Sequence, residues 1–300
     1  MTEELKVGLV GAGVFAGYHA GKVAAHSRAS LSGVFEPDQS RAEALAAQHG
    51  CDAFSDLDRL ASASDALIIA SPASYHAGAA IKGLLAGCHL LVEKPLATSV
   101  AIAEAIVNEA GRIGRVLQVG HQERIVMEAI GLKAVDATPR EIRIVRNSPR
   151  ATRNLDTSIV MDMMVHDLDL LNWLYGSPAW ISAEQTRSIY SEHIDEARAE
   201  LGYEGMTAYL QSSRDADSRR RWVLDYADGT VAIDFGDKTL RHDTPFALNP
   251  DFGDDPAVQD SLAAAFDRFV RACLDGTPPL ASGADGLAAV SVAAAIEGTP

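Results

Sequence analysis

The amino-acid sequence predicts an α/β protein with two domains: an N-terminal doubly wound parallel sheet and a C-terminal α/β domain with a large open mixed or antiparallel sheet. Two observations carry this prediction. Up to Gly120, short and continuously apolar segments alternate with Ala-rich stretches of helical length, which is typical of a parallel sheet covered on both faces. After Gly120, apolar and polar residues alternate between turn signals, which is typical of a sheet with one solvated face.

The N-terminal part contains the segments that we expect to be parallel strands: KVGLV (6–10), LSGVF (31–35), ALIIA (66–70), HLLVE (89–93) and VLQVG (116–120). The alternating segments that we expect in the second sheet are REIRIVRNS, AWISAEQTRSI, TAYLQSS, RRRWVLDYADGTVAIDF and KTLRHD. Asp228-Gly229 is typical of a hairpin turn. The change of pattern near residues 120–124 predicts one domain at 1–121 and a second at 122–300.

Several segments of the C-terminal part have the composition or the apolar spacing of helices. Residues 160–175, 257–275 and 285–297 are predicted to be helical. The segment YSEHIDEARAELGYEGM, residues 190–206, is expected to be a helical insertion or a lid.

Composition and charge exclude several classes of partner. The net charge of −15 at pH 7 would repel nucleic acid and anionic lipid, so neither is expected to bind. No apolar run approaches the length of a membrane span, and MTEELKVGLVGAG reads directly into a strand and a turn rather than a signal peptide, so we expect a cytoplasmic protein. Cys51, Cys88 and Cys273 lie far apart, which favours reduced thiols over disulfides or a zinc site.

A glycine-rich turn follows the first predicted strand. Gly11-Ala-Gly13-Val-Phe-Ala16 stands between a strand and a helical stretch, where glycines let the backbone approach a pyrophosphate at the helix N-terminus. Glu36 closes the next strand, where an acid would bind the adenosine ribose hydroxyls and repel a 2′-phosphate. The turn therefore predicts a dinucleotide and favours NAD, although the nearby Arg41 leaves NADP open. The alternative is an ordinary turn beside a solvated acid.

Two further polar groups follow predicted parallel strands. Ser71-Pro72-Ala-Ser-Tyr-His76 follows ALIIA, and Glu93-Lys94-Pro95 ends HLLVE. Because ligands bind at the carboxyl ends of strands in open α/β sheets, Lys94 is placed to orient a substrate hydroxyl and to exchange a proton. The alternative is a surface lysine in a loop.

The motifs GAGVFAGYH, SPASYH, LLVEKPLA, VGHQERI and DMMVHDLD together resemble the glucose-fructose oxidoreductase and inositol dehydrogenase family, Gfo/Idh/MocA, over essentially the whole chain. The resemblance implies an NAD(P)-binding Rossmann domain, a C-terminal domain whose open sheet supports substrate and oligomer contacts, and a homodimer or homotetramer. It matches Lys94, Asp162 and His166 to catalytic positions and His76 and Glu93 to cofactor-side positions. No metal is expected, because hydride transfer needs none. Ala16 and Met164 depart from glycines of the family pattern. The candidate cofactor-binding residues are Gly11, Gly13, Val14, Phe15, Glu36, Ser71, Pro72, His76, Glu93 and Lys94.

The helix predicted at 160–175 carries a polar stripe. Helical spacing places Asp162, His166, Asp169 and Trp173 on one face and most apolar residues on the other. An imidazole suits proton transfer near neutral pH, so His166 is the predicted general base, oriented by Asp162, while Lys94 holds the hydroxyl. The alternatives are a structural histidine, a metal site at Asp162, His166 and Asp169, or an Asp169 that only pairs with an arginine.

Asp167 falls on the apolar side of the predicted helix, where an unpaired carboxylate would be costly. It needs a buried partner, unless the helix begins later than residue 160.

The substrate is predicted from a group of arginines. Arg140, Arg143, Arg146, Arg150 and Arg153 lie in one short stretch, and as a strand it would place Arg146 on the face of Ile142 and Ile144, with Arg143 opposite. The stretch is either an anion site or a solvated edge. Resemblance is greatest to UDP-N-acetylglucosamine 3-dehydrogenases, which implies substrate contacts at Lys94, Arg124, Arg146, Asp162 and His166.

The function predicted from these residues is NAD(P)-dependent oxidation of a ring hydroxyl of a sugar, cyclitol or nucleotide sugar to a ketone, or the reverse reaction. One alternative on the same fold is an NAD-dependent glycosidase. Another is an NAD-binding sensor or regulator without turnover, against which the acid and base groups argue.

Overall fold

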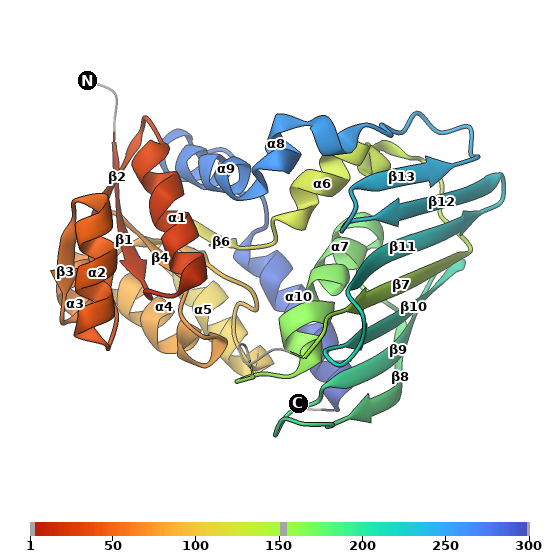
Figure 1. Ribbon diagram of the computed structural model, residues 1–300, viewed down its shortest axis with the longest axis horizontal. Helices are drawn as coiled ribbons and strands as arrows, with labels where there is room; N and C mark the ends of the chain where they lie inside the picture. Colours follow the sequence, from red (N-terminus) through yellow and green to blue (C-terminus); the bar gives the residue numbers. More distant parts are fainter. Residues whose placement is uncertain (1–3, 151–154, 299–300) are drawn as a thin grey trace. The chain divides into compact units, whose positions relative to one another are not determined.

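The structure, a computed structural model, describes residues 4–150 and 155–298 (Figure 1). The chain divides into two compact units, one of Met1–Gln122 with Leu262–Leu287 and the other of Glu123–Ser261 with Ala288–Pro300. The first stretch of unit 1 ends one residue after the predicted junction, and the unit also contains a later segment that the sequence analysis assigned to the second domain. Within the described ranges, no helix is both long and apolar enough to cross a membrane.

Unit 1 is built on a six-stranded parallel sheet with the order β3-β2-β1-β4-β5-β6. Its strands are β1 (Leu5–Val10), β2 (Ala29–Phe35), β3 (Asp52–Phe54), β4 (Ala66–Ile69), β5 (His89–Val92) and β6 (Leu117–Val119). All the predicted parallel strands are confirmed, and the short edge strand β3 is added. The strand order reverses between β1 and β4, which is where such sheets bind their ligands.

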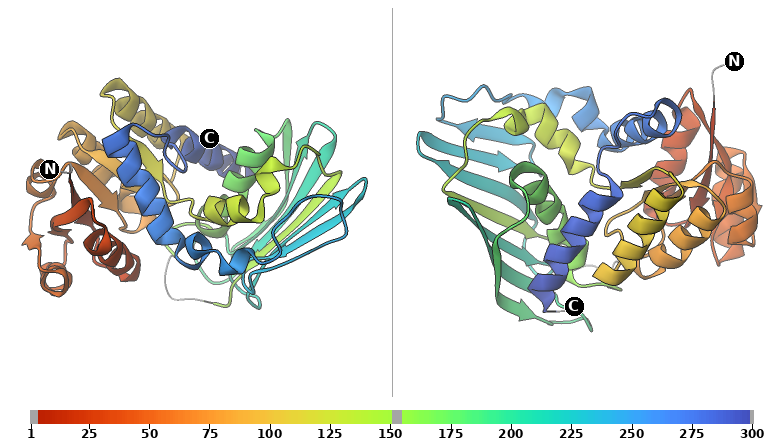
Figure 2. Two further views of the ribbon diagram at one scale, coloured as in Figure 1. Left: turned by 90° about the horizontal axis from the view of Figure 1, so that it is seen from above. Right: turned by 180° about the vertical axis from the view of Figure 1, so that it is seen from behind.

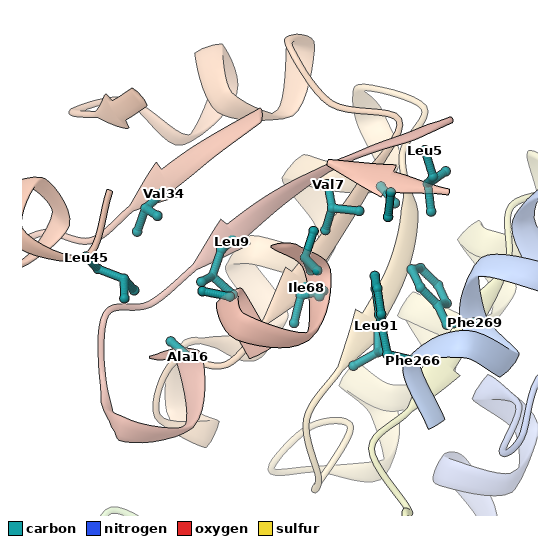
Figure 3. Close-up of a cluster of buried hydrophobic side chains, with 14 of the residues drawn as sticks. Leu5, Val7, Leu9, Ala16, Val34, Leu45, Ile68, Leu91, Phe266 and Phe269 are labelled. Carbon is teal, nitrogen blue, oxygen red and sulfur yellow. The ribbon is translucent and has the colours of Figure 1, made fainter. Parts of the chain in front are cut away.

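Helices cover both faces of this sheet. They are α1 (Val14–Ala25), α2 (Gln39–His49), α3 (Leu57–Ser62), α4 (His76–Leu85), α5 (Val100–Arg112) and α9 (Ser261–Asp275). Figure 3 shows the core on one face, where Phe266 and Phe269 of α9 join Leu9, Val34 and Ile68 in one buried cluster. The late helix α9 therefore completes the hydrophobic core of unit 1.

Unit 2 contains a seven-stranded mixed sheet with the order β13-β12-β11-β7-β10-β9-β8. Its strands are β7 (Glu141–Asn147), β8 (Trp180–Arg187), β9 (Glu196–Tyr203), β10 (Met206–Ser213), β11 (Arg219–Tyr226), β12 (Gly229–Asp234) and β13 (Thr239–His242). Only β7 and β10 pair in parallel among these strands. The predicted mixed sheet is confirmed, including the hairpin at Asp228-Gly229 between β11 and β12.

The two faces of this sheet differ. The helices of the unit include α6 (Glu123–Ile130), α7 (Val165–Tyr175), α8 (Pro256–Gln259) and the later part of α10 (Gly283–Glu297). They lie on one face of the sheet, and no helix among the described residues of unit 2 covers the other face (Figures 1 and 2). The uncovered face carries exposed side chains such as Arg143, Trp180 and Tyr209, whereas Ile142, Ile144, Trp222 and Leu224 are buried on the inner face.

The prediction of a helical insertion or lid at 190–206 is wrong, because Glu196–Tyr203 in this segment form strand β9 and no residue of the segment is helical. Ala197, Ala199 and Leu201 are buried, while the intervening Arg198 and Glu200 point the other way, which is the two-residue period of a strand. Pairing with β8 and β10 on both sides overrides the helical preference of its Glu, Ala and Arg residues.

Candidate active site

The glycine turn of unit 1 has the geometry of an anion-binding loop. Gly11 adopts φ +109°, and a Cβ at this position would lie 2.9 Å from the carbonyl oxygen of Ala70, so only glycine fits. Helix α1 begins after Gly13 without a side-chain cap, whereas Asp38, Asp56 and Ser99 cap α2, α3 and α5. Uncapped N–H groups and the positive end of the helix dipole therefore point out of the turn.

Glu36 extends this site from the end of β2. Its Oε2 accepts a hydrogen bond from the backbone N–H of Ala12 at 2.9 Å. Arg41 donates from Nη2 to the Ala12 carbonyl oxygen at 3.2 Å, and its Nη1 lies 3.7 Å from Glu36 Oε1. The Glu36 carboxylate is thus fixed beside the glycine turn, and the Arg41 guanidinium lies close to it.

These residues fit a dinucleotide. The turn supplies donors for a pyrophosphate, Glu36 supplies acceptors for ribose hydroxyls, and Val14 and Phe15 are exposed on the first turn of α1. Ser71, after β4, has a buried hydroxyl oxygen without a hydrogen-bond partner among the described residues. A buried unsatisfied oxygen at the strand-order reversal is consistent with a ligand contact.

His76 joins the loops that follow β4 and β5. It is 1% exposed, and its Nδ1 and Nε2 lie 2.8 Å from the Pro95 carbonyl oxygen and 2.9 Å from the Ser71 carbonyl oxygen. Burial lowers the pKa of His76 in spite of these contacts, so a neutral ring donates to one of the two carbonyls. The structure thus gives His76 a role in holding both loops, and its predicted contact with the cofactor stays a prediction.

Glu93, the residue before Lys94, is held by a residue that the sequence analysis missed. His19 of α1 is 1% exposed, and its Nε2 lies 2.8 Å from Glu93 Oε1. A Cβ at Gly120 would lie 2.6 Å from Glu93 Oε2, so the carboxylate is packed against the end of β6. The helix that starts at the glycine turn is therefore tied directly to the loop that carries Lys94. The sequence signal for His19 was its place at the end of the motif GAGVFAGYH, four residues after Phe15.

The remaining catalytic candidates lie in unit 2 around the start of α7. Asp162 lies in a π-helical turn, Val160–Met164, and the regular helix starts at Val165, immediately before His166. Both side chains are partly buried. The predicted helix at 160–175 is present, but its first turn is wider than the assumed α-helix, so the predicted stripe holds only from His166 onward. Single π-turns are rare and are frequent at functional sites.

Asp167 has the buried partners that its position requires. It is 1% exposed, and it accepts hydrogen bonds from Arg146 Nε at 2.7 Å, from Arg146 Nη2 at 2.9 Å and from Trp222 Nε1 at 2.8 Å. Arg146 is 2% exposed and also donates to both carboxylate oxygens of Glu123, at 2.8 and 2.6 Å. Both alternatives for Asp167 are therefore correct, because it has a buried partner and the regular helix begins after residue 160.

A second buried pair lies further along α7. Arg124 donates to both oxygens of Asp169, at 2.9 and 2.6 Å, and its guanidinium lies 5.4 Å from the centre of the Trp173 ring. The alternative in which Asp169 pairs with an arginine is thus confirmed. Among the described residues, no group of three or more His, Cys, Asp or Glu side chains is placed to hold a metal ion.

The predicted substrate-binding arginines are not free for a ligand in the way that the sequence suggested. Arg124 and Arg146 are both buried and bound to carboxylates, so their contact with a substrate stays a prediction. Arg143 points to the opposite face from Arg146, as predicted. Arg150 is exposed, pairs with Asp215 and lies over the Tyr190 ring, and Arg153 lies outside the described residues. The arginines of this stretch that the structure describes therefore do not form one anion site.

Replacing Glu36 with alanine is expected to raise the ratio of NADP to NAD use at least tenfold, because the carboxylate that would repel a 2′-phosphate is lost while Arg41 remains. The ratio of kcat/KM values for the two cofactors measures this. Glu43→Ala, which removes a carboxylate from the neighbouring helix α2, is the matched control and should leave the ratio unchanged. An unchanged ratio in Glu36→Ala would contradict the assignment.

The stability of unit 2 should depend on the charge of Glu123. Burial opposes its ionisation, but the charges of Arg146 and His166 and the hydrogen bonds from Arg146 lower the pKa of Glu123 to about 2. Because the pKa is lower in the folded state, the stabilisation is present above about pH 4.5 and is lost as the pH falls towards about 2; it amounts to about 3 kcal/mol. Urea unfolding across this range should show a smaller loss of stability in Glu123→Gln than in the unmodified protein. Equal losses in both would contradict this account.

Comparison with known proteins agrees with the geometry of both units. Residues 5–121 match a family model described as an oxidoreductase family with an NAD-binding Rossmann fold, and residues 107–232 match the GFO/IDH/MocA C-terminal domain. UDP-N-acetylglucosamine 3-dehydrogenase of Acidithiobacillus ferrooxidans is 32% identical over 98% of this chain and 97% of its own length. A solved structure of that enzyme superimposes with a TM-score of 0.88 at 30% identity, covering 98% of this chain and 96% of the other.

A more partial similarity is found with inositol 2-dehydrogenase of Leifsonia xyli, which is 34% identical over 59% of this chain and 55% of its own length. The predicted fold class and the predicted NAD cofactor are confirmed by the family match. The chain therefore belongs to the Gfo/Idh/MocA family of NAD-binding oxidoreductases.

Proposed function

We propose that the protein is an NAD-dependent dehydrogenase that oxidises a ring hydroxyl of a nucleotide sugar to a ketone. The observation that carries this proposal is the full-length similarity to UDP-N-acetylglucosamine 3-dehydrogenase, in a chain that has Lys94, Asp162 and His166. The glycine turn and Glu36 support NAD as the cofactor. An inositol is the second candidate substrate, because inositol 2-dehydrogenases are also similar to the chain.

The residues divide the chemistry between them. NAD, when bound, supplies the hydride acceptor. His166 takes the proton of the reacting hydroxyl, since a neutral imidazole accepts a proton near pH 7. Asp162 orients the ring and stabilises the imidazolium that forms. Lys94 holds the hydroxyl oxygen and stabilises the negative charge that develops on it.

The test is a substrate panel with NAD and, separately, with NADP. NADH absorbance is recorded with UDP-N-acetylglucosamine, UDP-glucose, myo-inositol and free glucose, with His166→Asn as the inactive control. We expect reduction of NAD with a UDP-sugar and none in the control. Release of UDP without net NADH would instead indicate the glycosidase alternative. Tight NAD binding without reduction by any compound would indicate a sensor.

We also propose that the protein is a cytoplasmic homo-oligomer, a homodimer or a homotetramer. The uncovered face of the seven-stranded sheet supports this assembly, because it exposes Trp180 and Tyr209 as well as charged side chains. Light scattering should give a mass of two or four chains of 31.8 kDa, and Tyr209→Glu should reduce it. A monomer at micromolar concentration would contradict the assembly.

A further inference from the structure

A buried cluster at the start of α7 joins four elements of unit 2. Glu123 comes from α6, Arg146 from β7, Asp167 from α7 and Trp222 from β11. The Arg146 guanidinium bridges the two carboxylates, and Trp222 donates to Asp167. We call these residues the α7 clamp. It ties the first turn of α7 to the sheet, one residue after His166.

We propose that the α7 clamp positions His166 and that the Glu123 carboxylate stabilises the imidazolium that forms when His166 accepts the substrate proton. The residues of the clamp are therefore positioning residues, which act through His166. This inference rests on the proposed function for the source of the proton, but the charge interaction itself does not.

The irregular turn before α7 explains why contacts at Asp167 matter for the orientation of the helix. In a π-helical turn the hydrogen bonds span five residues, so the 3.6-residue period does not carry the orientation of α7 across Val160–Met164. His166 follows this turn directly. The clamp holds Asp167 from the sheet and from α6, and two bidentate contacts with one guanidinium fix both distance and direction. The backbone that carries His166 is thus adjacent to a residue whose side chain is held by three hydrogen bonds.

The Glu123 carboxylate lies among several charged groups of unit 2. The charges that act on Glu123 of α6 are those of Arg146 on β7, His166 on α7 and Arg220 on β11. The charge of His166 acts on Glu123 and favours its ionised form. Because a Coulomb interaction is mutual, ionised Glu123 favours the protonated form of His166 by the same amount.

Arg146 explains why a carboxylate can stay ionised in this place. Burial disfavours the charge of Arg146, but the adjacent Asp167 and Glu123 carboxylates outweigh this effect and raise its pKa, so it remains a cation. Burial also raises the pKa of Asp167, and the same guanidinium offsets part of that rise. One buried cation thus supports two carboxylates, and the charge of one of them, Glu123, interacts with that of His166.

The direct test is the pKa of His166, measured by NMR of protein labelled at the histidine Cε1 position. His166→Asn identifies its resonance among the nine histidines. In Glu123→Gln, we expect the pKa of His166 to fall by about one unit, because a neutral amide replaces the carboxylate. Glu128→Gln removes the same charge from an exposed position of α6 and should leave the pKa unchanged. Glu123→Asp, which keeps the charge, should restore most of the shift, and it also serves if the glutamine variant does not fold.

Kinetics then distinguish an effect of the α7 clamp on His166 from a merely structural role of the same residues. With an active substrate, the acid limb of the pH profile of kcat/KM should move to lower pH in Glu123→Gln. At neutral pH, kcat should fall roughly tenfold, with little change in KM. Turnover with an unchanged profile and an unchanged His166 pKa would overturn the clamp and leave the proposed function intact. A shifted His166 pKa in a protein that oxidises no sugar would support the charge interaction and contradict the proposed function.

Discussion

Replacing Lys94 with alanine is expected to lower kcat roughly a thousandfold for the sugar substrate, because the developing alkoxide loses its cationic partner. Lys94 follows β5 at the carboxyl edge of the parallel sheet, and the preceding Glu93 is held by His19. The backbone of the loop should therefore survive the substitution. Steady-state kinetics measure the loss, and the melting temperature should change little.

Lys82→Ala is the matched control for this experiment. Lys82 lies on α4 in the same unit and pairs with Asp58 at 2.8 Å on the surface. Removing it deletes the same charge, and an exposed pair of this kind contributes little to stability. The control should keep its kcat. If Lys94→Ala retained more than about a tenth of the original kcat, the assignment of Lys94 to the chemical step would be wrong.

Replacing Gly11 with alanine is expected to weaken NAD binding tenfold or more and to destabilise the fold by about 1–3 kcal/mol. The new Cβ would meet the backbone of Ala70 and Ser71 at 2.9–3.0 Å, and φ +109° is unfavourable for an L-residue. Because the neighbours are backbone atoms, the turn itself must move, and its N–H groups move with it. Titration of NAD by calorimetry and urea unfolding measure the two effects.

Gly21→Ala separates the turn from a general effect of removing a glycine. Gly21 lies inside α1, and nothing lies within 4 Å of a Cβ at this position. The substitution should stabilise the helix by about 0.5–1 kcal/mol and leave the NAD affinity unchanged. Equal NAD affinities in Gly11→Ala and Gly21→Ala would contradict the role of the turn.

Much of the fold and of the cofactor region could be predicted from local patterns. Continuous apolar strands identified the parallel sheet, and alternation identified the second sheet. The glycine turn and the acid at the end of the next strand were recognisable because both roles depend on backbone geometry at fixed positions along the chain. The expected face of Arg146 followed from the two-residue period of a strand.

The rest depends on contacts between residues far apart in the sequence. Arg124 and Arg146 were predicted to contact the substrate, but buried carboxylates of α7 bind both of them, and these partners lie far away in the sequence. The role of Glu123 was not predicted, because no periodic pattern in the sequence distinguishes this residue from an ordinary surface acid. The π-turn was missed for a similar reason, since apolar spacing alone does not distinguish a local widening of the helix. Pairing on both edges turned a helix-favouring sequence into β9.

Hydride transfer from a ring carbon of the sugar to NAD is tested most directly by following a deuterium atom. UDP-N-acetylglucosamine deuterated at C3 of the sugar ring is incubated with the enzyme and NAD, and the reduced cofactor is analysed by mass spectrometry. We expect one deuterium to appear in the nicotinamide ring of NADH, and we expect His166→Asn and Lys94→Ala to suppress its appearance. Unlabelled NADH, or no NADH with any deuterated sugar of the panel, would contradict hydride transfer from a ring carbon.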